Sequence, residues 1–498
     1  MHLSTLLDCD LVAVEQTDEL TLLVELTAPT PTTRTARPPA PLQGVLDRSG
    51  SMAGDRLDGA KDALLALVDR LDPSDNLGIG AFDNAVQIVV PAGTLANKAA
   101  VKAAIAAVDA GGSTDLSAGY LRGLQEAHRV AGPTGATVLL ISDGHANAGV
   151  TDTDTLGSVA EQAAAKGVTT STLGFGLGYD ERLLAALAHG GNGNELFAEE
   201  ADSAVAKISG EVDGLLDQVA QAASLQLTWS HYVAGIDVLN DLTVTGLPDG
   251  AMLELGSFYA GETRRLVITL KIPSIAALGL VQVATLTFTH VSLPDLVQHV
   301  TTLPVHVNVV PGDQAAGRIP DPKVRSEALF QRTQQAKRES SRLLSQGRGD
   351  EAYEMLQGAS ASLRSASAGL PAELSAELFG EADVMDALAD ESRLDIGRAA
   401  KATSYDASTK SRTRGRHLRG GRVVVRCADG CTELALEEWE VQRLLRGLPE
   451  ELVRALSPSR SLRGPQVCLE LHVALADQPA GSFFSSCAGH GGFTVDRA

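Results

Sequence analysis

The chain has 498 residues, of which 44% are hydrophobic, 21% charged and only 4% aromatic. This composition is ordinary for folded protein, and the length exceeds the roughly 250 to 300 residues at which a single core stops growing, so several domains are expected. The 62 acidic residues outnumber the 41 basic ones and give a net charge of -21. That charge argues against a general binder of nucleic acid or of an anionic membrane surface.

The N-terminal residues and the cysteines favour a cytoplasmic protein. Residues 1–10 carry Asp8 and Asp10 and lack the basic and apolar regions of a signal peptide. No stretch of about 20 uncharged apolar residues offers a membrane span. Five cysteines, with Cys9 isolated, fit a reducing compartment better than a disulfide framework.

Residues 1–42 predict a β-element followed by a stiff connector. β-forming residues cluster at 11–14 and 20–24, and five prolines follow between residues 29 and 41. We expect this element to complete a β-sandwich formed by later strands, with another domain inserted between the two parts.

Residues 43–217 predict an α/β domain built on a doubly wound, Rossmann-like and mostly parallel sheet. Apolar runs alternate with helical periods, and uncharged runs such as 138–141 are typical of strands buried on both faces. A hairpin over residues 77–90 adds an antiparallel edge. The expected strands are 77–82, 86–90, 137–141 and 168–173, and the expected helices are 56–71, 97–108, 116–130, 155–166 and 211–221.

The next two segments predict a β-sandwich over residues 222–312 and a helical bundle over residues 320–405. Short strands separated by Pro and Gly are typical of a sandwich, and the β pattern ends near Pro322. The expected strands are 225–228, 238–242, 265–271, 281–290 and 300–309, and the expected helices are 323–346, 350–366 and 371–391.

Residues 406–498 predict a basic linker and a tail that contains cysteines. The run from Lys410 to Arg426 has no acidic residue, so we expect a solvated linker, with contact to nucleic acid or an acidic partner as the alternative. Any two of three Cys or His pairs in the tail would supply the four ligands of a tetrahedral Zn²⁺ site. Buried free thiols and a poorly folded tail are the alternatives. The pairs are Cys427 with Cys431, Cys468 with His472, and Cys487 with His490.

A candidate metal-binding loop follows the short apolar run 44–46. Asp47, Ser49 and Ser51 place one carboxylate and two hydroxyls on alternate residues, whose side chains point the same way in an extended turn. Hard cations such as Mg²⁺ prefer oxygen ligands. Two neutral hydroxyls leave much of the ion's charge uncompensated, so such an ion would attract an anion from outside.

Two later residues fall on the same edge of the predicted sheet. Thr114 lies in a Gly-Gly-x-Thr-Asp segment before a helix, and Asp143 follows a buried strand in an Ile-Ser-Asp-Gly segment. Ligands of doubly wound sheets gather at the carboxyl ends of the strands, so we expect both residues near the loop. The alternative is that Ser49, Ser51 and Asp143 only cap a helix or form an Asx-turn.

Together, these five residues resemble a known family motif. Asp47-x-Ser49-x-Ser51, Thr114 and Asp143 look like the metal-ion-dependent adhesion site of the von Willebrand factor A domain, in a bacterial cytoplasmic form, over about residues 43–217. The resemblance implies that Ser49, Ser51 and Thr114 contact Mg²⁺, or Mn²⁺ or Ca²⁺ in its place. It also implies that Asp47 and Asp143 act largely through water and that a Glu or Asp of a partner protein completes the site.

The expected function is a Mg²⁺-dependent protein-interaction module or scaffold without enzymatic activity. A first alternative is a regulatory or adaptor subunit of an AAA+ ATPase complex of the chaperone or chelatase type. The resemblance suggests it, because cytoplasmic members of the family in bacteria often act together with such ATPases. A second is a metal-dependent hydrolase, for which His145 is the candidate base, although no motif places a His beside a nucleophile. A dinucleotide site at residues 174–178 fails because Tyr179 occupies the position where the fingerprint needs its last glycine.

Overall fold

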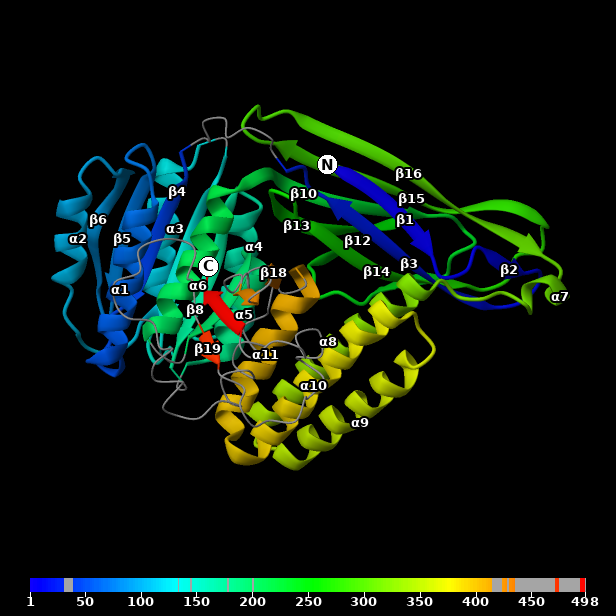
Figure 1. Ribbon diagram of the computed structural model, residues 1–498. Helices are drawn as coiled ribbons and strands as arrows, with labels where there is room; N and C mark the ends of the chain where they lie inside the picture. Colours follow the sequence, from blue (N-terminus) through cyan, green and yellow to red (C-terminus); the bar gives the residue numbers. More distant parts are fainter. Residues whose placement is uncertain are drawn as a thin grey trace. The chain divides into compact units, whose positions relative to one another are not determined.

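The computed structural model divides into two compact units, Met1–Arg414 and Gly415–Ala498. It describes residues 1–30, 39–132, 134–143, 146–176, 179–198, 201–413, 423–427, 430–434, 471–473 and 493–497. The first unit holds a mixed sheet flanked by helices, an antiparallel β region and a group of long helices (Figure 1). The predicted combination of α/β fold, β-sandwich and C-terminal helices is therefore confirmed.

The α/β part is a six-stranded sheet in the order β6-β5-β4-β7-β8-β9. All neighbouring strands pair in parallel except β6, which pairs antiparallel with β5 at one edge. The central strand β4 lies between β5 and β7, so its carboxyl end has strand ends on both sides. The strands are β4 (Pro41–Asp47), β5 (Asn76–Phe82), β6 (Val86–Thr94), β7 (Ala136–Ser142), β8 (Val168–Phe175) and β9 (Asn192–Ala198).

Helices cover both faces of this sheet. On one face, α3, α4 and α5 pack on the sheet in one hydrophobic core, and Val45 of β4 is part of this core. On the other face α1 packs against α6, and Leu64 of α1 lies close to Gly44. The helices are α1 (Asp55–Arg70), α2 (Lys98–Ala106), α3 (Leu116–Val130), α4 (Thr153–Ala164), α5 (Glu181–Gly190) and α6 (Ala201–Leu216), with a short 3-10 helix η1 (Gly50–Met52) before α1.

Two glycines bring α3 close to the sheet. A Cβ at Gly123 would lie 2.3 Å from Cγ2 of Val45, and one at Gly119 would lie 2.4 Å from Cγ of Phe82. Side chains at these positions would push the helix away, because a packed interior has no room for added atoms. The close approach fixes the N-terminus of α3 near the carboxyl ends of β4 and β5.

The sequence did not predict α5 and β9, and it placed the last helix of this part wrongly. α6 ends at Leu216, and residues 218–221, expected in a helix, begin β10 instead. The reason is tertiary pairing, since Ala220 faces Phe258 of one neighbouring strand and Ser292 of another.

The antiparallel region consists of two sheets that share one core. A four-stranded sheet has the order β1-β3-β14-β11, and a six-stranded sheet has the order β12-β13-β10-β15-β16-β2, in which β2 alone pairs in parallel. Leu22 and Leu266 of the first sheet pack into the same hydrophobic cluster as Leu225 and Leu286 of the second. The strands are β1 (His2–Leu7), β2 (Leu11–Ala13), β3 (Asp18–Thr27), β10 (Gln218–Trp229), β11 (Gly235–Val238), β12 (Val244–Leu247), β13 (Gly250–Tyr259), β14 (Thr263–Ile272), β15 (Gly279–Ser292) and β16 (Gln298–Val310), and a short helix α7 (Gly312–Ala315) follows.

One strand in this region ends earlier than the sequence predicts. A strand was expected over residues 238–242, but β11 ends at Val238. The side-chain Nδ2 of Asn240 donates to the backbone carbonyl of Arg265 at 2.9 Å. The side-chain Oδ1 of Asn240 accepts from the backbone amide of Val267 at 2.8 Å. A side chain therefore takes the hydrogen-bonding positions that a continuing strand would need.

Four long helices form the last part of the first unit, where α8 packs against α9 and α11, and α10 against α9 and α11. They are α8 (Pro322–Ser345), α9 (Gly349–Ser367), α10 (Ala372–Leu394) and α11 (Ile396–Thr413). The expected boundary at 405/406 falls inside α11, so the expected linker is wrong for residues 406–413. In the described part of the chain, no helix combines the length and apolar character that a membrane crossing requires.

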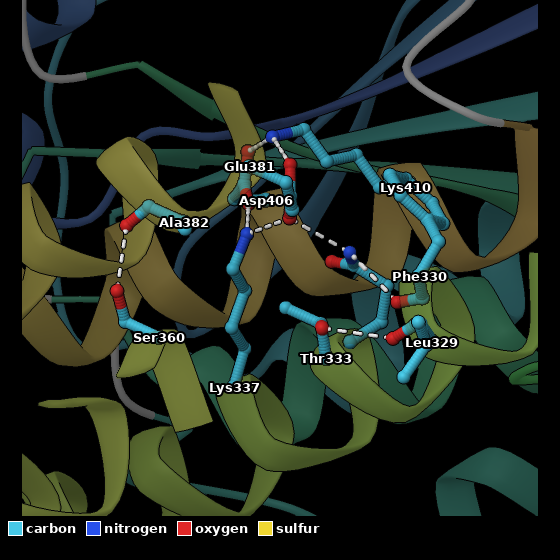
Figure 2. Close-up of polar contacts among 10 residues, drawn as sticks. Leu329, Phe330, Thr333, Lys337, Ser360, Glu381, Ala382, Asp406 and Lys410 are labelled. Atoms are coloured by element: carbon cyan, nitrogen blue, oxygen red, sulfur yellow. Dashed lines mark hydrogen bonds and ion pairs between the residues drawn. The ribbon is translucent and has the colours of Figure 1, made fainter. Parts of the chain in front are cut away.

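Buried charges connect these helices (Figure 2). Lys337 of α8 is fully buried and forms ion pairs with Glu381 of α10 and Asp406 of α11. Lys410 pairs with the same two carboxylates, at 2.8 and 2.9 Å. Two cations and two anions therefore balance inside the bundle. Burial opposes ionisation of Glu381, but the two lysines outweigh it and lower the pKa of this carboxyl.

The second unit contains a four-stranded antiparallel sheet in the order β18-β17-β20-β19. Its strands are β17 (Val423–Cys427), β18 (Gly430–Leu434), β19 (Leu471–Val473) and β20 (Phe493–Arg497).

Candidate metal centre

Asp47 is the last residue of β4, and its buried carboxylate joins two strand ends. Oδ1 accepts a hydrogen bond from the amide of Ser49 at 2.8 Å, and Oδ2 accepts from Oγ of Ser142, the last residue of β7, at 2.6 Å. Both bonds hold the chain in a turn directly after β4. The turn points Ser49 and Ser51 toward the end of β7.

The two hydroxyls of the loop form a chain that ends on Asp143. Oγ of Ser49 lies 3.2 Å from Oγ of Ser51, which donates to Oδ1 of Asp143 at 2.9 Å. Ser49 occupies the N-cap position of η1 without a side-chain capping bond, and Gly54 occupies that position of α1. Helix capping therefore does not account for either serine.

Thr114 reaches this edge through pairing between two loops. The amide of Gly50 donates to the carbonyl of Gly112 at 2.9 Å, and the amide of Gly111 donates to the carbonyl of Arg48 at 2.6 Å. The amide of Thr114 donates to Oδ1 of Asn147 at 2.9 Å, and the residue is buried. Asp115 then caps α3, accepting from the amide of Ala118 at 2.9 Å.

Two arginines border the cluster. Nη1 of Arg56 lies 2.7 Å from Oδ2 of Asp143, and Nη2 of Arg48 lies 3.1 Å from Oδ2 of Asp83. Asp83 also accepts from the amides of Ala85 and Gly112, and these bonds and Arg48 outweigh burial and lower its pKa. The sequence pattern predicted no role for Arg56, Asp83, Ser142 or Asn147. Only the polar character of these four residues, close to the motif segments, could have suggested them.

The electrostatics of Asp47 favour a cation nearby. Burial raises the pKa of its carboxyl, hydrogen bonds from Ser142 and Ser49 act in the opposite direction, and the Asp143 carboxylate adds to the rise. A positive ion beside the two carboxylates would oppose both effects that raise this pKa.

The donor set fits a hard divalent ion. It comprises two carboxylates and three hydroxyls, and oxygen donors of this kind suit Mg²⁺, Mn²⁺ or Ca²⁺ better than Zn²⁺. Among the residues that the structure describes, no three His, Cys, Asp or Glu side chains form a metal-binding group, so carboxylates alone do not make a site here. The candidate base His145 lies outside the described residues.

Half of the six candidate zinc ligands of the tail lie outside the described residues. Cys427 ends β17 and Cys431 lies in β18, where Cys431 pairs with Arg426. His472 lies in β19. The other three, Cys468, Cys487 and His490, are not among the described residues. The zinc hypothesis therefore stays a prediction.

Comparison with known proteins identifies the α/β part. A family model for the von Willebrand factor type A domain matches residues 44–211. The uncharacterized protein sll0103 of Synechocystis is 34% identical over 161 residues, which cover 32% of this chain and 38% of that protein. The uncharacterized protein YfbK of Escherichia coli is 32% identical over 196 residues, which cover 39% of this chain and 34% of that protein. The matches thus span little more than a third of either relative.

A solved structure extends the likeness in fold beyond the α/β part. The von Willebrand factor type A protein from Catenulispora acidiphila aligns with 82% of this chain and 96% of its own, with a TM-score of 0.63 and 15% identity. At that identity the likeness concerns the fold alone. Residues 44–211 are therefore a von Willebrand factor type A domain, carried by a chain that has bacterial homologues.

Proposed function

We propose that the protein binds a partner protein through a divalent ion, Mg²⁺ in the first place, held by Asp47, Ser49, Ser51, Thr114 and Asp143. The observation that carries the proposal is the hydrogen-bonded chain from Ser49 through Ser51 to Asp143, because it brings oxygen donors of two distant segments together. Von Willebrand factor type A domains are typically adhesion or protein-interaction modules and often bind a divalent metal, which supports this function.

The charge of the donor set supports an acidic ligand from outside. Asp143 already faces Arg56, so the two carboxylates neutralise a divalent ion incompletely. A Glu or Asp side chain of a partner would supply the missing negative charge and an oxygen for the remaining position. The ion's role is then to polarise and hold that carboxylate, while the protein residues fix its place.

Binding accounts for the site better than hydrolysis does. The cationic groups bonded to the cluster in the described residues are the guanidinium groups of Arg48 and Arg56. Arginine stays protonated in proteins and cannot act as a general base, and the carboxylates of Asp47 and Asp143 are already engaged by Ser142 and by Arg56. We therefore propose that the protein is not an enzyme.

A capture experiment tests the proposal. The full chain is used as bait in a lysate of its own organism with Mg²⁺, with EDTA, and as the Ser49→Ala plus Ser51→Ala variant. The exposed pair Ser74→Ala plus Ser158→Ala, in the same domain, is the matched control. A partner retained only with Mg²⁺, by the wild type and the control, is expected. The same proteins in all samples would overturn the proposal.

A further inference from the structure

Arg56 borders the candidate metal centre with a guanidinium that is only partly bonded. Its Nη1 atom donates to Oδ2 of Asp143 at 2.7 Å and to the carbonyl oxygen of Ser51 at 3.4 Å. No hydrogen bond from Nε or Nη2 occurs within the described part of the chain. The side chain of Arg56 is 42% exposed, whereas that of Asp143 is fully buried. One end of the guanidinium is therefore fixed at the metal centre, and its other donors are available to a group from outside.

The loop after β8 leaves space beside these free donors. A Cβ at Gly176 would lie 3.2 Å from Nε of Arg56 and 3.6 Å from Nη2. Gly176 also has a φ of 75°, so its backbone conformation alone favours glycine. The consequence is the same in either case, because no side chain from this position covers the edge of the guanidinium that carries Nε and Nη2.

The second arginine of the site is not available in this way. Arg48 is 22% exposed, its Nη2 atom lies 3.1 Å from Oδ2 of Asp83, and its Nε atom is buried. Asp83 is not one of the five candidate ligands, so Arg48 keeps its counter-charge when an ion binds. Arg56 instead shares Asp143 with the proposed ion, and its charge is then less fully compensated.

The charges around the site call for one negative charge from outside. The carboxylates of Asp47 and Asp143 would balance a divalent ion if Arg56 did not also face Asp143. One positive charge is left over and is shared between the ion and the guanidinium. A single carboxylate neutralises it, and its two coplanar oxygens match the donors of a guanidinium.

We propose that Arg56 is a second anchor for the partner's carboxylate, with one oxygen of the Glu or Asp side chain on the ion and the other on Nε or Nη2 of Arg56. This inference rests on the proposed function and names the residue that makes the site selective for an acid. The side-chain amide of an Asn or Gln would carry no charge and would turn its own donors toward those of Arg56. Arg56 therefore opposes binding of the ion alone and favours binding of the acid to the occupied site.

Mn²⁺ titration of the full-length chain in the presence of acetate tests this inference. Acetate is the smallest probe with the carboxylate of Asp and Glu, and acetamide is its neutral counterpart of nearly the same shape. Mn²⁺ affinity is measured by electron paramagnetic resonance in chloride, in acetate and in chloride with acetamide, at equal ionic strength. Protein-free samples correct for complexes of Mn²⁺ with acetate. For the wild type, we expect acetate to raise Mn²⁺ affinity at least about threefold, because two ligands that favour each other do so reciprocally, and acetamide to have no effect.

The Arg56→Gln variant separates the two effects of the arginine. It should bind Mn²⁺ more tightly than the wild type in chloride, and acetate should no longer raise its affinity. Its own Mn²⁺ binding shows that its site is folded. Arg122→Gln is the control and should behave as the wild type does, since Arg122 is 44% exposed and also pairs with a buried carboxylate. A purely structural role, in which Arg56 only holds Asp143 in place, predicts weaker Mn²⁺ binding and an unchanged acetate effect.

The outcomes distinguish this inference from the proposed function. An equal acetate effect in the wild type and Arg56→Gln, an equal effect of acetate and acetamide, or weaker Mn²⁺ binding by Arg56→Gln in chloride would overturn the inference alone. No acetate effect in the wild type would also overturn it, and the capture experiment would then decide on the proposed function. Absence of Mn²⁺ binding by the wild type would overturn the proposed function itself.

Discussion

Arg56 of α1 pairs with Asp143, a candidate metal ligand that follows β7, with 2.7 Å between Nη1 and Oδ2. The other carboxylate oxygen of Asp143 accepts from Ser51 at 2.9 Å. The guanidinium therefore competes with a bound ion for one of the two negative charges of the site. This relationship suggests that Arg56 weakens metal binding and leaves the ion dependent on a partner's carboxylate.

Replacing Arg56 should strengthen metal binding. We expect Arg56→Ala to bind Mg²⁺ up to about tenfold more tightly, or ~1.4 kcal/mol, because a positive charge beside the ion is removed. Titration calorimetry with MgCl₂ measures the change. Arg122→Ala is a matched control. The side chain of Arg122 is 44% exposed and that of Arg56 is 42% exposed, and each pairs with a buried carboxylate. Equal or weaker Mg²⁺ binding by Arg56→Ala would contradict the competition.

Loss of the N-cap of α3 should lower both the stability of this helix and the affinity of the metal centre for Mg²⁺. Asp115 caps α3 and also accepts from Ser117 at 2.7 Å, and it directly follows Thr114. Asp115→Ala should lower the free energy of unfolding by about 1 kcal/mol and also weaken Mg²⁺ binding. Asp152 caps α4 in the same way. Asp152→Ala should affect helix stability without changing Mg²⁺ affinity, and equal affinity in both variants would refute the coupling.

Breaking the buried charge cluster should destabilise the protein strongly. Lys337→Met leaves Glu381 and Asp406 with one cation instead of two inside the bundle. We expect a loss of about 3–5 kcal/mol in the free energy of unfolding, measured by urea denaturation. Arg348→Met, which breaks an exposed pair with Glu351, should leave the urea midpoint nearly unchanged. Similar midpoint shifts in both variants would be inconsistent with this account.

Glu195 should give the protein a distinctive dependence on pH. Burial raises the pKa of its carboxyl to about 8, and the negative charges of Glu181 and Asp241 add to this rise. The positive charge of Lys401 acts in the opposite direction. Tyr179, whose pKa is raised by burial first and by Glu195 next, is a further neighbour. The folded state therefore keeps a proton that the unfolded chain loses above its ordinary pKa of about 4.3. Its stabilising contribution is complete below about pH 4.3 and is lost progressively as the pH rises from there to about 8.

The Glu195→Gln variant isolates this effect. Its free energy of unfolding should be close to that of the wild type at about pH 4 and higher than that of the wild type at about pH 9, because the glutamine cannot ionise. Urea denaturation at both pH values measures the difference. Parallel pH profiles for the two proteins would show that Glu195 does not titrate in this way.

The core of the candidate site could be predicted because its pattern is local. Asp47, Ser49 and Ser51 alternate directly after an apolar strand, and parallel strands bring their carboxyl ends to one edge. Arg56 could not be assigned, because its pairing with Asp143 depends on how α1 lies on the sheet, across 87 residues of sequence.

Charged residues explain the main errors in the fold. The run that begins at Lys410 was interpreted as a solvated linker, yet Lys410 is buried between Glu381 and Asp406, and Arg412 donates to the carbonyl of Gly193. A sequence does not show which distant acid will neutralise a basic residue. β9 was missed for a related reason, since the buried Glu195 interrupts the apolar pattern of that strand.

Mn²⁺ binding, followed by electron paramagnetic resonance, shows directly whether Asp47, Ser49, Ser51, Thr114 and Asp143 hold a divalent ion. Free Mn²⁺ is titrated against the wild-type chain, the Ser49→Ala plus Ser51→Ala variant and the exposed-serine control. We expect one ion per chain for the wild type and the control, displaced by Mg²⁺, and loss of that ion in the double variant. The same bound ion in the double variant, or no bound ion in the wild type, would contradict it.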